Sequence, residues 1–152
     1  MASYDKVTRL CSMKYGDSDD IVPVPDAIFH CSAYQIAGAP DVYPTYGDMS
    51  EAWAPRTEKR AEFLELMFLT SVQVTGIDIY ETHLGGAVSA VKCYQNGGYT
   101  TLWTSPSIER IIFARIFQPQ LATGCFSNRI KLEIAAITGW VNIDAVQLHG
   151  YI

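Results

Sequence analysis

The residue whose chemistry draws attention first is His83, in the stretch VTGIDIYETHLGGAVSAVKCY (residues 74–94). Two runs of alternating apolar and polar residues flank the segment His83-Leu84-Gly85-Gly86. An imidazole in such a loop can donate or accept a hydrogen bond with a ligand hydroxyl, whereas many histidines in turns only face solvent. The glycine pair serves the backbone of the turn, because glycine reaches positive φ without steric cost.

Sequence signals of catalysis are weak. The chain contains no G-x-S-x-G elbow, no H-E-x-x-H pair and no phosphate-cradling glycine loop. Glu81 and Glu109 could form a pair for glycoside hydrolysis, but the sequence does not fix the distance between them. We therefore predict that the protein is not an enzyme.

The charge balance excludes one class of partner. The 152 residues include 11 Lys and Arg against 16 Asp and Glu, which gives a net charge of −5 at pH 7. The basic residues are scattered, apart from a short cluster at Arg56, Lys59 and Arg60. Binding to nucleic acid irrespective of sequence needs a basic surface, so we do not expect a nucleic-acid partner.

Length and hydropathy predict one globular domain over residues 1–152. No apolar run reaches the roughly 18 residues of a membrane-spanning helix, so no transmembrane segment is expected. The stretch MASYDKVTRLC lacks the apolar centre of a secretory signal. This favours a cytoplasmic location, unless the chain is a processed form.

The cysteines are widely spaced. They are Cys11, Cys31, Cys93 and Cys125. No C-x-x-C pair is present, so the spacing typical of zinc ligands is absent. We expect free buried thiols, and the alternative is a disulfide such as Cys11–Cys31, which would imply an oxidising compartment.

Runs of alternating apolar and polar residues recur every 10–14 residues or so in the second part of the chain, which is typical of an all-β sandwich or barrel. The expected strands are 62–69, 72–81, 87–94, 99–103, 110–117, 128–136 and 141–150. The apolar phase slips at Gly76, which predicts a bulge. The turn Gln95-Asn96-Gly97-Gly98 predicts a hairpin. Residues 1–61 are less regular and are expected to pack on the strands.

Antiparallel strands place alternate loops at the same end of a sandwich. The segment 54–61 and the loops 82–86, 105–110 and 136–140 should therefore share one end, called here the near end. This end would gather several polar and aromatic side chains. They are Arg56, Lys59, Arg60, His83, Glu109, Arg110 and Trp140.

Three stretches carry a family resemblance: AGAPDVYPTYGDMSEAWAP (37–55), VTGIDIYETHLGGAV (74–88) and GWVNIDAVQLHG (139–150). In their order and spacing they resemble the discoidin-like, galactose-binding-like family, the jelly-roll β-sandwich of the C-type domains of coagulation factors V and VIII. The likeness covers about residues 28–150. It is greatest to the discoidin-like region of an F-box and leucine-rich-repeat protein, although this chain has neither an F-box nor such repeats.

The resemblance implies a lectin-like module that binds a galactose-type or related sugar, free or on a glycoprotein. Aromatic rings pack on the C–H face of a sugar, and polar groups bond its hydroxyls. The predicted ligand-binding residues are Arg56, Glu81, His83, Arg110 and Trp140. The alternative is a protein-interaction domain, suggested by Leu84, Ile108 and Trp140 in loops. Phospholipid binding ranks last, because the chain is acidic.

The resemblance also implies a structural calcium ion. Calcium takes six to eight oxygen ligands, and Asp41, Asp48 and Asp144 are the predicted carboxylates. Asp144 lies in an otherwise apolar strand, where an unpartnered carboxylate is costly. A network of backbone hydrogen bonds or an arginine contact would satisfy Asp144 equally well, and these alternatives stay open.

Overall fold

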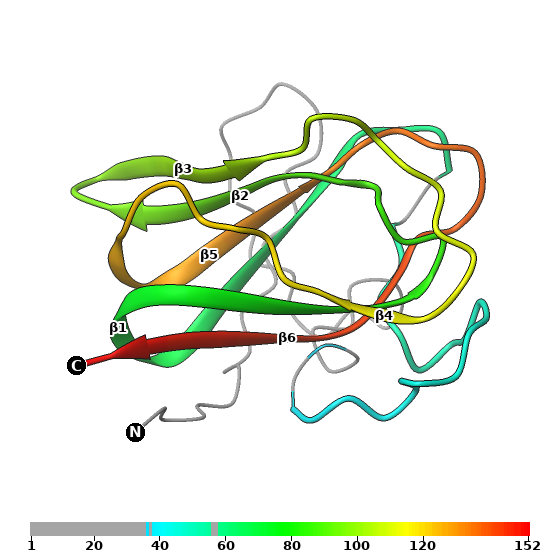
Figure 1. The fold of residues 1–152 in the computed structure, drawn as a ribbon, viewed down its shortest axis with the longest axis horizontal. Coiled ribbons are helices and arrows are strands. Elements are labelled where there is room, and N and C mark those ends of the chain that lie inside the picture. The colour runs from blue at the N-terminus through cyan, green and yellow to red at the C-terminus, as the bar shows by residue number, and fades with distance from the viewer. Residues whose placement is uncertain (1–35, 37, 56–57) are drawn as a thin grey trace, which may run out of the picture.

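The computed structural model describes residues 36, 38–55 and 58–152 (Figure 1). Six β-strands form the framework of this part of the chain. They are β1 (Glu62–His83), β2 (Val88–Gln95), β3 (Gly98–Thr104), β4 (Arg115–Phe117), β5 (Phe126–Ile134) and β6 (Asn142–Tyr151). Within the described residues, no helix has the length and apolar character needed to span a membrane. The predicted site residue Arg56 and the cysteines Cys11 and Cys31 lie outside the described residues.

Strand β1 belongs to both layers of the sandwich. Its first part pairs with β5, and its second part pairs with β6 and β4. In Figure 1 the first part runs beside β5, and the chain then bends so that the second part runs beside β6. Apolar side chains from both parts, such as Leu66 and Ile79, are fully buried in one core. The strands expected at 62–69 and 72–81 are thus one bent strand.

The strand order is β3-β2-β5-β1-β4, with β6 also paired to β1, and all five strand pairings are antiparallel. The bulge predicted at Gly76 is confirmed by a register shift against β6 between Val74 and Gly76. The predicted hairpin is confirmed as well. Asn96 and Gly97 both have positive φ, 53° and 80°, as a tight two-residue turn requires. The predicted all-β, antiparallel sandwich is therefore the observed fold.

Strand β4 is shorter than the predicted strand 110–117. Beyond Glu81, the partner of Arg115, the chain makes a single bridge between Gly85 and Ile111 in place of a ladder. The side chains that follow Ile111 are not taken into the core. Ile112 is 71% exposed and Phe113 is 59% exposed.

The cysteine prediction was wrong for two of the four residues. Cys93 on β2 and Cys125 before β5 form a disulfide, and both are buried. Alternation along β2 points Cys93 into the core, and the β4–β5 connection brings Cys125 against it. Disulfides are typical of oxidising compartments, and the expected cytoplasmic location stays a prediction.

Candidate functional site

The loops expected at the near end do lie together. The amide of Glu109 donates to the carbonyl of Gly86 at 3.1 Å, which joins the loops after β1 and β3. The amide of Lys59 donates to the carbonyl of Ile137 at 3.0 Å, which joins the lead-in of β1 to the β5–β6 loop. In Figure 1 this end is on the right, opposite the β2–β3 turn and the C-terminus.

Gly86 explains how two of these loops approach so closely. It has a φ of 91°, and a Cβ atom there would lie 2.9 Å from Cβ of Glu109 and 3.0 Å from its carbonyl oxygen. A side chain would therefore force the loops apart.

His83 is held in one orientation at the end of β1. Its Nδ1 lies 2.6 Å from the carbonyl oxygen of Trp140. A carbonyl only accepts, so Nδ1 carries the proton, and Nε2 of the neutral ring is a hydrogen-bond acceptor. The ring of Tyr46 packs against the imidazole, with centroids 5.2 Å apart. His83 thus presents an acceptor beside an aromatic face.

Arg110 lies on the other side of the β5–β6 loop, whose Trp140 carbonyl is bonded to His83. Its Nη1 donates to the carbonyl of Thr138 at 3.2 Å, and its Nη2 lies 4.0 Å from the place of a Cβ on Gly139. The segment from Thr138 to Trp140 therefore contacts Arg110 at one end and His83 at the other. Trp140 itself is half-buried. Together these groups offer guanidinium donors, an imidazole acceptor and aromatic rings.

Glu81 was predicted to contact a ligand, and the structure contradicts this. Its side chain is 0% exposed. One carboxylate oxygen accepts from the amide of Gly86 at 3.1 Å, and the other pairs with Nε of Arg115 at 2.6 Å. A Cβ on Gly85 would lie 2.5 Å from that second oxygen. Glu81 is therefore an internal anchor for the loop after β1, and it cannot form a hydrolytic pair with Glu109.

Asp144 is buried in β6 and bound by backbone amides. Its carboxylate accepts from the amides of Asp41, Val42 and Tyr43, at 3.3, 3.1 and 2.8 Å. Of the alternatives that the sequence left open, the backbone network is the one observed. A hydrogen bond to the carboxyl of Asp144, together with desolvation and charge repulsion, raises the pKa of the Asp41 carboxyl above its ordinary value.

Of the three carboxylates predicted to bind calcium, the structure brings Asp41 and Asp144 together. Asp48 is exposed, and the described residues contain no group of three or more His, Cys, Asp or Glu that could hold a metal ion. Amide N–H groups aimed at Asp144 also suit an anion and repel a cation. The described carboxylates alone therefore do not make a calcium site, and the calcium ion stays a prediction.

Sequence reasoning missed the contribution of Tyr46 to the site and wrongly placed the side chain of Leu84 on the surface. Tyr46 was not a predicted ligand residue, and its place in the irregular 37–55 segment gave no signal of its contact with His83. Leu84 was expected to be an exposed loop residue, but it is 4% exposed. The backbone of Leu84, with a φ of 45°, turns its side chain inward against Gly139. Ile108 is exposed, as expected.

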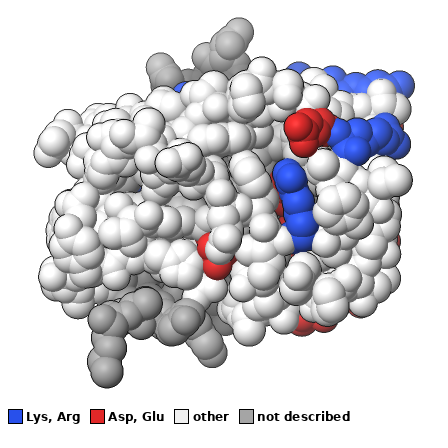
Figure 2. Space-filling view, in the orientation of Figure 1, with Lys and Arg blue, Asp and Glu red and all other residues white. Residues whose placement is uncertain are grey.

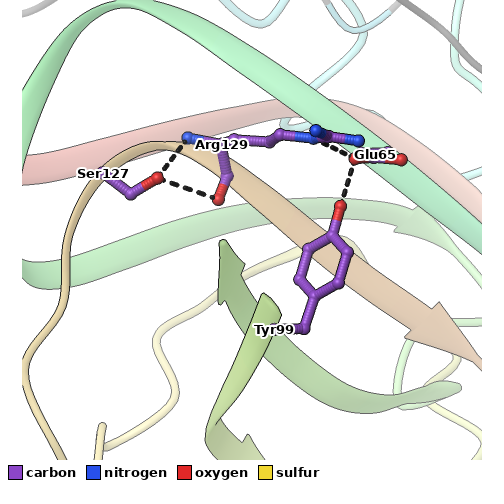
Figure 3. A network of polar contacts seen from close by, with 4 residues as sticks. All are labelled: Glu65, Tyr99, Ser127 and Arg129. Carbon is purple, nitrogen blue, oxygen red and sulfur yellow. Dashed lines mark hydrogen bonds and ion pairs between the residues drawn. The ribbon is translucent and has the colours of Figure 1, made fainter. Parts of the chain in front are cut away.

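A second polar cluster lies on the outer face of the layer formed by β3, β2, β5 and the start of β1 (Figure 3). Glu65 receives hydrogen bonds from the hydroxyl of Tyr99 and from Nε of Arg129, while Ser127 bonds the backbone of Arg129. Burial and the nearby carboxylate of Glu65 raise the pKa of the Tyr99 hydroxyl. The hydrogen bond to Glu65 raises the pKa of Arg129. These groups satisfy one another and bind the strands together.

Comparisons with known proteins place the chain among related sequences. The model of the family described as "Pappalysin-1, SD scarf domain, C-terminal" matches residues 21–151. The chain is also 28% identical to F-box/LRR-repeat protein 4 of Bos taurus, over 77% of the chain and 24% of that protein. The chain thus spans about a quarter of the length of that relative.

Solved structures share the fold at low sequence identity. CpGH89CBM32-6 of Clostridium perfringens matches with a TM-score of 0.52 and 13% identity, over 70% of this chain and 82% of that one. XRCC1, in its reduced form bound to the catalytic domain of DNA polymerase β, matches with a TM-score of 0.58 and 14% identity, over 99% and 100% of the two chains. These matches confirm the discoidin-like, galactose-binding-like resemblance at the level of the fold.

Proposed function

The chain belongs to the family of the C-terminal SD scarf domain of pappalysin-1, and from this premise we propose that it is a non-catalytic module that binds carbohydrate through the near-end loops. The ligand is a galactose-type or related sugar, free or on a glycoprotein. The fold of a carbohydrate-binding module from Clostridium perfringens supports the proposal in outline. The same fold carries many functions, so the residues of the site must carry the rest.

The observation that carries this proposal is the fixed imidazole of His83. Because Nδ1 is bonded to the carbonyl of Trp140, Nε2 can accept from a sugar hydroxyl. The ring of Tyr46 beside it provides a surface for the C–H face of a pyranose. Arg110 supplies donors across the β5–β6 loop. The site thus offers a hydrogen-bond acceptor and hydrogen-bond donors for the sugar hydroxyls, and an aromatic ring for the apolar face of the sugar.

Calorimetric titration and a glycan array test the proposal. His83→Ala and Tyr46→Ala should each weaken sugar binding by about tenfold, the effect of one lost hydrogen bond or ring contact in a binding site. His149→Ala is a matched control, since His149 lies toward the other end of β6 and pairs with Asp78 at 3.0 Å. Equal losses in His83→Ala and His149→Ala, or no binding of any sugar by folded protein, would refute the proposal.

A second candidate function is protein binding, favoured by exposed apolar side chains in and before β4. Ile108, Ile112, Phe113 and Ile116 are between 37% and 71% exposed. XRCC1, which shares the fold, is bound to a polymerase domain in its structure. Phe113→Asp should abolish capture of a protein partner without loss of folding. Leu84→Asp is unsuitable for this test. Leu84 is buried, so the charge of the introduced aspartate would disrupt the core.

A further inference from the structure

The Lys and Arg side chains of the described residues divide into two sets. There are seven, and four are engaged by other side chains of the chain. These are Lys92, paired with Glu133 at 2.5 Å; Arg115, paired with Glu81; Arg129, paired with Glu65; and Lys131, whose Nζ lies 4.3 Å from the ring centroid of Phe63. Their charged groups are therefore engaged by carboxylates or an aromatic ring within the fold.

The remaining three are Lys59, Arg60 and Arg110, and all three are exposed. Among the described residues none of them forms an ion pair. All lie at the near end, where the backbone of Lys59 contacts Ile137 and Arg110 contacts Thr138. On the face seen in Figure 2, Lys and Arg side chains gather toward this end.

This grouping is unusual in a chain with a net charge of −5. An acidic chain has ample carboxylates to pair with its cations, yet in the part of the chain that the structure describes the cations without an ion pair lie together at one end. Glu58 and Glu109 are exposed in the same loops, so the near end is of mixed charge, but no ion pair with the cations forms among the described residues. Clustered free cations raise the local concentration of an anionic ligand and hasten its association.

We propose that the near-end site is selective for an anionic saccharide, one that carries carboxylate or sulfate groups. This inference rests on the proposed function and narrows its ligand class. Arg110 uses one of its five N–H donors on Thr138, which leaves a planar fork suited to a carboxylate or sulfate. His83 and Tyr46 hold a sugar ring, while Lys59 and Arg60 attract charge on a neighbouring sugar.

The test compares one saccharide in charged and neutral form. Calorimetry measures the titration of three probes into the full chain. They are short oligogalacturonate, the same oligosaccharide fully methyl-esterified, and sulfated galactan oligosaccharides. We expect the charged form to bind roughly tenfold more tightly than the ester at low salt. This preference should shrink as ionic strength shortens the range of the charges. The carboxylated and sulfated probes distinguish the two sources of charge.

Variants locate the effect. The double variant Lys59→Gln with Arg60→Gln should reduce the preference for the charged probe several-fold, with little effect on the ester. Arg110→Gln should weaken binding of both forms, because Arg110 also donates to the sugar, but it should weaken the charged probe more. Lys92→Gln removes a matched charge already paired with Glu133, and should leave the preference intact. Thermal melts confirm that each variant folds.

The outcomes separate the two proposals. Equal affinity for the acid and its ester would overturn the anionic preference and leave the carbohydrate function standing. A preference that survives in Arg110→Gln and in the double variant would also overturn it. No binding of either form, or of neutral sugars, would overturn the carbohydrate function itself.

Discussion

The buried pair of Glu81 and Arg115 predicts an asymmetric response to mutation. Glu81 is 0% exposed, while Arg115 is 25% exposed, so only the arginine can regain water when its partner is removed. Arg115→Met leaves a buried carboxylate whose one remaining hydrogen-bond partner among the described residues is the amide of Gly86. Stranding such a charge costs about 3–5 kcal/mol of unfolding free energy.

Glu81→Gln should cost less. The amide of glutamine still offers an oxygen to Gly86, and the partly exposed guanidinium of Arg115 can be hydrated. The loss is then mainly that of one charge-assisted hydrogen bond, about 1.5–3 kcal/mol, at the lower end because of the exposure of Arg115. The double variant should be more stable than Arg115→Met alone, because the stranded charge is gone.

Urea unfolding followed by circular dichroism measures all three variants against the parent chain. The three midpoints at pH 7 give the coupling energy of the cycle. If Arg115→Met costs no more than Glu81→Gln, or if the two effects simply add, then Glu81 is not the buried anchor that the geometry indicates.

Three further predictions concern other parts of the fold. The disulfide closes a segment with a sequence separation of 32, and its removal in the double variant Cys93→Ser with Cys125→Ser should cost about 4 kcal/mol by the chain-entropy relation; an unchanged urea midpoint would contradict it. Asp41→Asn should raise the midpoint slightly at pH 7. Because the pKa of Asp41 is raised in the folded protein, protonation of Asp41 favours folding, and this stabilisation is lost as the pH rises through the folded pKa. The stability advantage of Asp41→Asn should therefore vanish below pH 3.8, the ordinary pKa of the group. A difference in midpoint that stays constant across pH would refute the reasoning. The predicted calcium ion is tested by melting with and without CaCl₂: since the amides of the 41–43 segment bind Asp144, calcium should not raise Tm, and a rise abolished by Asp144→Asn would restore the calcium site.

The architecture was predictable because it depends on local patterns that repeat. Alternation of apolar residues places Leu66 and Leu132 in the core, and the Asn96-Gly97 turn sets the register of a hairpin. Once strands pair antiparallel, the parity of loops follows without knowledge of side-chain contacts. This is why the loops around His83, Arg110 and Trp140 could be assigned to one end from the sequence.

The state of each polar residue was less predictable, because it depends on a distant partner. Glu81 is buried because Arg115, 34 residues away, reaches it, and no local pattern marks that pair. Asp144 is held by amides more than 100 residues away. The cost of burying a carboxylate required some partner for Asp144, but this cost does not distinguish amides from a cation. The contact of Tyr46 with His83 is of the same long-range kind.

The two buried carboxylates give the near end its electrostatic character. The charge of Glu81 is neutralised by Arg115, and that of Asp144 is spread over three amides, so neither carboxylate projects into solvent. Each instead anchors a segment that carries a candidate ligand residue: Glu81 fixes the turn after His83, and Asp144 fixes the loop that leads to Tyr46. With these carboxylates withdrawn inside, the field at the surface depends more on the exposed cations than the sequence alone suggests. Weakening the contacts of Glu81 or Asp144 should therefore disorder the loops of the site without changing the surface charge of the near end. Glu81→Gln should then weaken sugar binding without changing its salt dependence, which would distinguish an effect on loop position from an effect on charge.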